Sequence, residues 1–132
     1  MINAGGKDCM GDSIKELTEK IVAFRDARNW KQFHNPKDIA ISIMLEASEL
    51  LEVFQWSGAD TAVDTDKKMA KVREELADVL IYSLLMGHDL GLDIAEIVSE
   101  KIDENNRKYP VEKAYGRADK YTAYAEEKEA DE

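Results

Sequence analysis

Two pairs of acidic residues interrupt apolar stretches of the chain at the spacing of a helix. The first pair, Glu46 and Glu49, lies in LEASELLEVFQW. The second pair, Glu75 and Asp78, lies in REELADVLIY. A helix turns by about 100° per residue, so each pair points in one direction, and two neighbouring helices would bring the four carboxylates together. Carboxylate oxygens are ligands that Mg²⁺ prefers, so the pattern indicates a magnesium site.

The ordinary explanation of such a pair is a solvated helix face, and two features argue against it here. Like charges three residues apart on a helix repel each other, and these acids lie among side chains that should be buried. There is also no Lys, Arg or His from Asp38 to Asp66, so the glutamates of that segment have no local cation. A divalent ion bound by all four carboxylates would relieve the repulsion.

Other metals fit the sequence less well. A di-iron bundle requires Glu-x-x-His motifs on two helices, and neither His34 nor His88 has an acidic residue three positions before it. Catalytic zinc generally takes histidine ligands. Cys9 is the only cysteine, which excludes an internal disulfide and a cysteine-based zinc site. Mg²⁺ remains the expected ion, with Mn²⁺ as a substitute.

Aromatic residues accompany the acidic faces. Trp56 and Tyr82 each lie seven residues after one acid of a pair, and therefore on the same helix face. Trp30 and His34 lie in RNWKQFHNP, just before the helix of the first pair. The rings either belong to the core or stack on a nucleotide base, and His34 is either a satisfied loop residue or a binding residue. The spacing leaves both interpretations open.

The elements that must position these residues are all helical. Capping signals and apolar periodicity predict an all-α protein with four main helices, over residues 13–29, 36–56, a third that ends near residue 90, and 93–110. The second helix is apolar around most of its circumference, which predicts burial on several sides.

The fourth predicted helix has one polar, basic stripe at positions i, i+4 and i+7. The stripe consists of Lys101, Asn105 and Lys108. Such a stripe is ordinarily a solvated face, but it could also bind phosphate groups that a metal leaves uncovered.

The composition limits the other functions of the chain. Its 132 residues fit one domain, with an expected flexible leader at 1–12, a helical catalytic domain at 13–110, and an extension at 111–132 that ends in an acidic tail and is flexible rather than folded. A net charge of −10 argues against binding a nucleic acid polymer. No apolar run resembles a signal peptide or a membrane span, so we expect no membrane association and a cytoplasmic location.

Together, these motifs resemble those of the MazG-like all-α nucleoside triphosphate pyrophosphohydrolases. The two acidic pairs occur in the order typical of that family and are followed by KIDENNRKYP. The similarity to the dCTP pyrophosphatase branch extends to RDARNWKQFHNPKDIA, LLEVFQW, EELADVLIY and RADKYTAY, and it covers roughly residues 14–124. The chain departs from many members of the family in having Leu45, rather than a glutamate, immediately before the first acidic pair.

The resemblance implies a four-helix bundle-like fold of the MazG type that assembles as a homodimer or homotetramer, with active sites near subunit contacts. It implies Mg²⁺ bound by the catalytic carboxylates, Glu46, Glu49, Glu75 and Asp78. It also implies that base and sugar contact a set of pocket residues, Trp30, His34, Trp56, Tyr82 and Asn105.

The implied activity is magnesium-dependent hydrolysis of deoxynucleoside triphosphates such as dCTP to the monophosphate and pyrophosphate, which removes unwanted nucleotides from the pool. Two alternatives stay open. The main substrate could be dUTP or a modified nucleotide, or the chain could be a non-catalytic helical module whose acidic stripe binds a partner or a structural cation.

Overall fold

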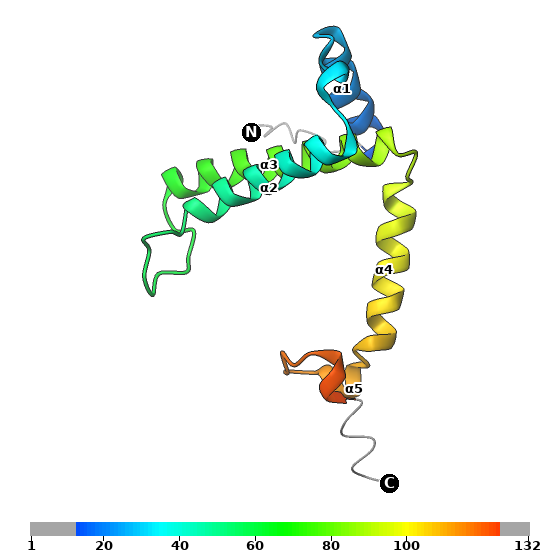
Figure 1. The fold of residues 1–132 in the computed structure, drawn as a ribbon. Coiled ribbons are helices and arrows are strands. Elements are labelled where there is room, and N and C mark those ends of the chain that lie inside the picture. The colour runs from blue at the N-terminus through cyan, green and yellow to red at the C-terminus, as the bar shows by residue number, and fades with distance from the viewer. Residues whose placement is uncertain (1–12, 125–132) are drawn as a thin grey trace, which may run out of the picture. The chain divides into compact units, whose positions relative to one another are not determined.

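The computed structural model describes residues 13–124, and within that range the chain forms helices joined by turns and loops, with no strand. The elements are, in order, α1 (Ile14–Ala27), the 3₁₀ helix η1 (Trp30–Phe33), α2 (Pro36–Glu52), α3 (Asp66–Asp89), α4 (Ile94–Lys108) and α5 (Val111–Ala114) (Figure 1). The predicted all-α class is confirmed, and α1 to α4 are the four helices expected. The predicted leader, Cys9 and residues 125–132 of the acidic tail lie outside the described residues.

The starts of α2 and α3 are fixed by side-chain caps. Asn35 Oδ1 accepts a hydrogen bond from the Asp38 amide at 2.9 Å, and Pro36 occupies the first helical turn, where its missing N–H costs nothing. Thr65 Oγ1 accepts from the Lys68 amide at 3.2 Å. Since a helix has a fixed period, these caps also determine which residues of α2 and α3 face each other.

The described residues form two compact units, which are divided between Asp93 and Ile94. In the first unit, α2 and α3 lie side by side, and α1 also packs against α3 (Figure 1). Ile39 of α2 and Leu85 of α3 are buried in this unit. The predicted domain boundaries after residues 12 and 110 stay predictions. None of the helices in residues 13–124 combines the length and the apolar character needed to cross a membrane.

A buried ion pair joins α1 to the end of α3. The Arg25 side chain is almost completely buried, and its Nη1 donates to both carboxylate oxygens of Asp89, at 2.8 and 2.7 Å. Its Nε donates to Asp26 at 3.0 Å. A charge removed from water in this way is tolerated only with such partners, so the pair fixes α1 on α3.

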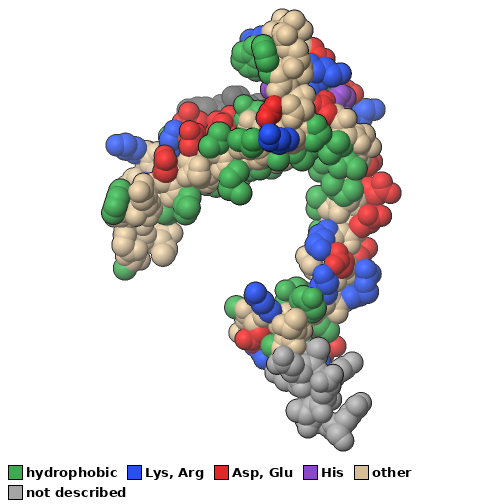
Figure 2. All heavy atoms as spheres, viewed as in Figure 1, with side chains coloured by type: hydrophobic (Ala, Val, Ile, Leu, Met, Phe, Trp, Pro, Cys, Tyr) green, Lys and Arg blue, Asp and Glu red, His purple; other side chains and the backbone are tan. Residues whose placement is uncertain are grey.

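Within a single chain α2 is buried on one side only, so its predicted burial on several sides, which requires a second subunit, stays a prediction. Ile39 is buried, but four other apolar residues are exposed, Ile41, Met44, Leu45 and Leu51. The reason is that α3 covers one side of α2 only, and Figure 2 shows apolar side chains gathered along the exposed side of the α2–α3 pair. A strongly apolar helix was correctly identified, but its cover does not come from residues 13–93.

The end of α2 also differs from the prediction. The helix stops at Glu52 rather than near Trp56, and the following residues form turns. The amides of Val53 and Phe54 donate to carbonyls three residues back, those of Leu50 and Leu51, at 3.3 and 3.0 Å. This tightening of the last turn is common where a helix ends without a glycine cap.

In the second unit, residues 111–124 are folded, and the prediction of a flexible extension is wrong for this part. The ring of Tyr109 packs edge-on against the rings of Tyr121 and Tyr124, with centroids 6.3 and 6.1 Å apart. Tyr124 is buried, and its backbone oxygen accepts from Lys113 Nζ at 3.5 Å. The segment is mostly polar, so its composition does not indicate that its tyrosines pack together and bury apolar surface.

Candidate metal centre

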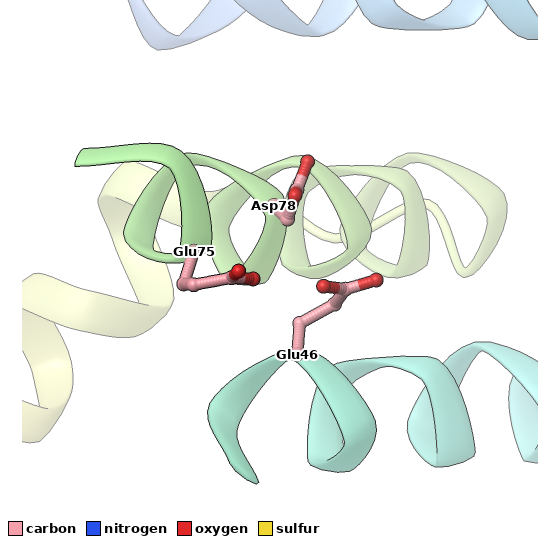
Figure 3. A group of neighbouring side chains, drawn as sticks. All are labelled: Glu46, Glu75 and Asp78. Carbon is pink, nitrogen blue, oxygen red and sulfur yellow. The ribbon is translucent and has the colours of Figure 1, made fainter. Parts of the chain in front are cut away.

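Three of the four predicted carboxylates converge between α2 and α3. Glu46 extends from α2, and Glu75 and Asp78 lie one turn apart on α3 (Figure 3). One carboxylate oxygen from each of the three lies within 4.8 Å of the others. Oxygens that share an octahedral Mg²⁺ at about 2.1 Å from the ion are about 3 to 4 Å apart, so small side-chain movements suffice to bind such an ion.

Glu75 is the most deeply buried acid of the group, with 1% of its side chain exposed. Its Oε1 accepts a charged hydrogen bond from Lys71 Nζ at 2.5 Å, whereas its Oε2 is buried and has no hydrogen-bond partner. The contact with Lys71 lowers the pKa of Glu75, so this carboxyl is ionised at neutral pH. A buried anionic oxygen without a partner is costly, and a bound cation would remove that cost.

Glu46 is partly buried and experiences the opposite effect. Burial raises its pKa above the usual value, and the charges of Glu49 and Asp78 raise it further. No ion pair to Glu46 is found among residues 13–124. The acids therefore repel one another, and the single ammonium of Lys71 does not balance them.

Glu49 lies one turn after Glu46 on α2 and is exposed. It does not belong to the three residues whose oxygens converge, although its carboxyl group is close to those of Glu46 and Glu75 and acts on the pKa of both. The prediction that Glu49 also binds the metal stays a prediction.

The donor set fits a hard divalent cation. All three convergent groups are carboxylates, and the buried Oε2 of Glu75 is available as a ligand. Carboxylate oxygens suit Mg²⁺, Mn²⁺ and Ca²⁺, whereas Zn²⁺ sites usually include nitrogen or sulfur. The geometry therefore supports the expected class of ion.

The predicted aromatic residues lie in three different surroundings. The Tyr82 ring, on α3, lies edge-on to the His34 ring with 6.4 Å between centroids. Trp30 packs edge-on against Phe24 at 5.8 Å and is half exposed. Trp56 follows α2 and is 90% exposed, so its ring has no cover in the first unit. Their predicted contacts with a base stay predictions.

His34 lines a pocket of about 350 Å³ at the start of α2. The other lining residues are Lys31, Asn35, Pro36, His88 and Asp89. The Nδ1 atom of His34 is buried and has no hydrogen-bond partner. The motif around Trp30 predicts a role for His34 but none for Lys31 or His88, because nothing in the spacing indicates that the start of α2 meets the end of α3.

The polar stripe belongs to the second unit, on α4. Glu104 accepts hydrogen bonds from both lysines of the stripe, from Lys101 at 2.6 Å and also from Lys108. These contacts lower the pKa of Glu104 to about 2. Asn105 is exposed. Both ammonium groups thus have an acidic partner, and their predicted role in binding phosphate stays a prediction.

Comparisons with known proteins agree with the resemblance seen in the motifs. The family model described as the MazG-like family matches residues 41–123. The chain is 34% identical over 114 residues to dCTP pyrophosphatase 1 of Mus musculus, and 31% identical over 113 residues to that of Homo sapiens. Each match covers 83% of this chain and 66% of the relative, so the chain spans just under two thirds of the length of these relatives.

A solved structure is similar as well. The crystal structure of a pyrophosphatase from Archaeoglobus fulgidus DSM 4304 superposes with a TM-score of 0.67 at 38% sequence identity. The match covers 75% of this chain and 94% of that protein. Both the sequence and the helical arrangement thus have relatives among pyrophosphatases.

Proposed function

This chain belongs to the MazG-like family, and from that premise we propose that it hydrolyses a deoxynucleoside triphosphate between the α and β phosphates, releasing the monophosphate and pyrophosphate. The names of its relatives, dCTP pyrophosphatase 1 and a pyrophosphatase, support this activity. The observation that favours it most in the structure is the convergence of Glu46, Glu75 and Asp78, together with the buried Oε2 of Glu75, which has no hydrogen-bond partner.

The proposed cofactor is Mg²⁺, for which Mn²⁺ can substitute. Glu46, Glu75 and Asp78 would hold the ion, with Glu49 as a further ligand or as a group that acts on water. When bound, the ion supplies neutralisation of the triphosphate, stabilisation of the pyrophosphate leaving group and a lowered pKa of a bound water. Without the metal ion, the acidic side chains of the site would repel the negatively charged triphosphate.

A carboxylate near the attacking water can orient it and accept its proton. Glu46 and Glu49 are the two candidates on α2. We favour Glu49, because it is exposed and is not one of the three acids whose oxygens converge. Glu46, as a member of that group, would be engaged as a ligand.

Recognition of the nucleotide would come from the aromatic residues and from α4. Stacking on Trp30, Trp56 or Tyr82 supplies affinity for any base, while hydrogen bonds from His34 and Asn105 select among bases. Lys101 and Lys108 would bind phosphate oxygens. We propose dCTP or a related nucleotide as substrate, with dUTP and modified cytidine nucleotides as the nearest alternatives, and removal of unwanted nucleotides from the cytoplasmic pool as the role.

The exposed apolar residues of α2 support assembly as a homodimer or homotetramer. Met44, Leu45 and Leu51 are each more than half exposed in the single chain. A contiguous apolar surface of this kind is usually covered in the native assembly. No nucleic acid polymer or membrane is proposed as a partner, because the chain is strongly acidic.

The direct test is pyrophosphate release from dCTP, dATP, dUTP and 5-methyl-dCTP with Mg²⁺. We expect release from at least one of them, and loss of release in Glu75→Gln and Asp78→Asn. If no triphosphate yields pyrophosphate, or if both variants keep full activity, the enzymatic proposal is wrong. Metal binding without any pyrophosphate release would favour the non-catalytic acidic module.

A further inference from the structure

Lys71 is a residue of the carboxylate site that the family motifs do not include. It lies one turn before Glu75 on α3, with half of its side chain exposed. Its Nζ is 2.5 Å from Oε1 of Glu75 and 3.3 Å from Oε2 of Glu74. The ammonium thus reaches from the solvent side of the helix to an acid that is 1% exposed.

The contact makes the two oxygens of Glu75 different. Oε1 is engaged by Lys71, whereas Oε2 is buried, has no partner and belongs to a side chain that converges with Glu46 and Asp78. Lys68 lies three residues before Lys71 on α3. Its ammonium is paired with Asp60 at 2.5 Å, so it does not take the place of Lys71 beside Glu75. Glu75 therefore has one oxygen engaged by an ammonium and one oxygen without a donor, while the carboxyl groups of Glu49 and Glu46 lie close to it.

The number of free oxygens matters for the choice of ion. Mg²⁺ requires an octahedral shell of about six ligands at about 2.0 to 2.1 Å and suits carboxylates that bind through one oxygen. Ca²⁺ takes about six to eight oxygens at about 2.3 to 2.6 Å and often binds carboxylates through both. A carboxylate with one engaged oxygen is therefore a better ligand for the smaller ion.

We propose that Lys71 is a positioning residue that sets the ion selectivity of this site: by engaging Oε1 of Glu75, it restricts that carboxylate to binding through Oε2 and so favours Mg²⁺ over Ca²⁺. The inference rests on the proposed function in one respect, that the three carboxylates hold a divalent ion. It does not depend on which nucleotide is the substrate.

The test compares ion affinities of the full chain without nucleotide. Binding of Mn²⁺ is followed by electron paramagnetic resonance, and Mg²⁺ and Ca²⁺ are measured by competition. In Lys71→Met we expect the ratio of the Ca²⁺ to the Mg²⁺ dissociation constant to fall about fivefold, because Glu75 can then bind Ca²⁺ through both oxygens. Loss of a positive charge strengthens binding of both divalent ions alike, so this effect cancels in the ratio.

Three further variants make the result specific. Lys71→Arg retains a cation for Oε1 and should keep the wild-type ratio. Lys67→Met, one turn earlier on α3, removes the same charge without a contact to Glu75 and should also keep the ratio within about twofold. Lys71→Gln provides a second neutral variant, and circular dichroism reports whether each variant is helical.

The possible results separate this inference from the proposed function. If Mn²⁺ binds normally and the ratio is unchanged in both Lys71→Met and Lys71→Gln, the role of Lys71 is overturned while the metal site stands. If wild-type protein binds no Mn²⁺, or Glu75→Gln binds it undiminished, the proposed metal site is wrong and the inference fails with it.

Discussion

Helices α3 and α4 both place lysines three or four residues from glutamates, yet the resulting clusters are opposites. On α4, one acid, Glu104, is shared by two cations, Lys101 and Lys108. On α3, one cation, Lys71, is shared by Glu75 and its neighbour in sequence. The α4 cluster is solvated and satisfied, whereas in the α3 cluster a buried oxygen of Glu75 has no partner.

The difference shows that spacing alone does not distinguish a surface ion pair from a metal site. Solvent-exposed ion pairs contribute little to stability and require no further counter-charge. Buried acids that outnumber their cations require a further positive charge, because neither water nor a side chain balances them. Glu46 and Asp78 add to this excess on the α2–α3 side. We therefore expect the α3 cluster to bind a cation, whereas the α4 cluster is complete by itself.

The largest expected effect is that of removing divalent ions. With a chelator present, pyrophosphate release from the preferred triphosphate should fall to the background rate and return when Mg²⁺ is added in excess. The reason is that the acids of the α3 cluster repel the triphosphate unless cations neutralise both. If pyrophosphate release continues at the full rate in the chelator, the α3 cluster needs no cation and does not differ from the α4 cluster in this respect.

The next effect compares one acid from each helix with the same chemical change. Asp78→Asn should lower the rate of pyrophosphate release by about 100-fold or more, because it removes a ligand charge from the convergent group. Asp103→Asn, on the exposed surface of α4, should change it by less than about twofold. Steady-state assays with saturating Mg²⁺ provide the measurement, and equal losses in the two variants would contradict this assignment.

A smaller effect concerns stability without metal. Glu46→Gln should raise the thermal midpoint of the metal-free protein by about 2 to 4 °C, because burial and the charges of Glu49 and Asp78 raise the pKa of Glu46, and a neutral amide removes this unfavourable charge. Added Mg²⁺ should then stabilise the wild type but not the variant. Differential scanning calorimetry in chelator and in Mg²⁺ tests both statements. A lower midpoint of the variant in chelator would show that the acids of the wild type are already balanced.

The smallest effect belongs to α4. The pKa of Glu104 is lowered from 4.5 to about 2 by its hydrogen bonds with Lys101 and Lys108. A lowered pKa in the folded state means that the contribution of Glu104 to stability is present above pH 4.5 and is lost as the pH falls through about 2. At pH 7 the thermal midpoint of the wild type should therefore be about one or two degrees higher than that of Glu104→Gln. Near pH 2 the two midpoints should be the same. A difference that persists at pH 2 would have another cause.

Local signals in the sequence were sufficient to predict the helices and the pairing of the acids. The caps at Asn35 and Thr65 act at short range, and the i, i+3 spacing of Glu75 and Asp78 is a property of any helix. The family resemblance is confirmed by the match to the MazG-like model. The same spacing rule at i, i+4 connects Lys71 to Glu75 and would have revealed that ion pair.

The features that sequence reasoning missed depend on contacts between distant segments. The burial of Tyr124 depends on Tyr109 and on the path of the chain between them, which composition does not encode. The exposure of Met44 and Leu51 depends on how much of α2 a single partner helix covers. Tertiary packing decides both, and periodicity describes only one element at a time.

The most direct test of the metal site is Mn²⁺ binding to the full chain without nucleotide, measured by electron paramagnetic resonance on wild-type protein and on Glu75→Gln. We predict saturable binding to the wild type and at least about tenfold weaker binding to the variant, because Oε2 of Glu75 is the buried oxygen that lacks a partner. Equal binding by the two proteins would contradict the assignment of the α2–α3 carboxylates as the metal centre.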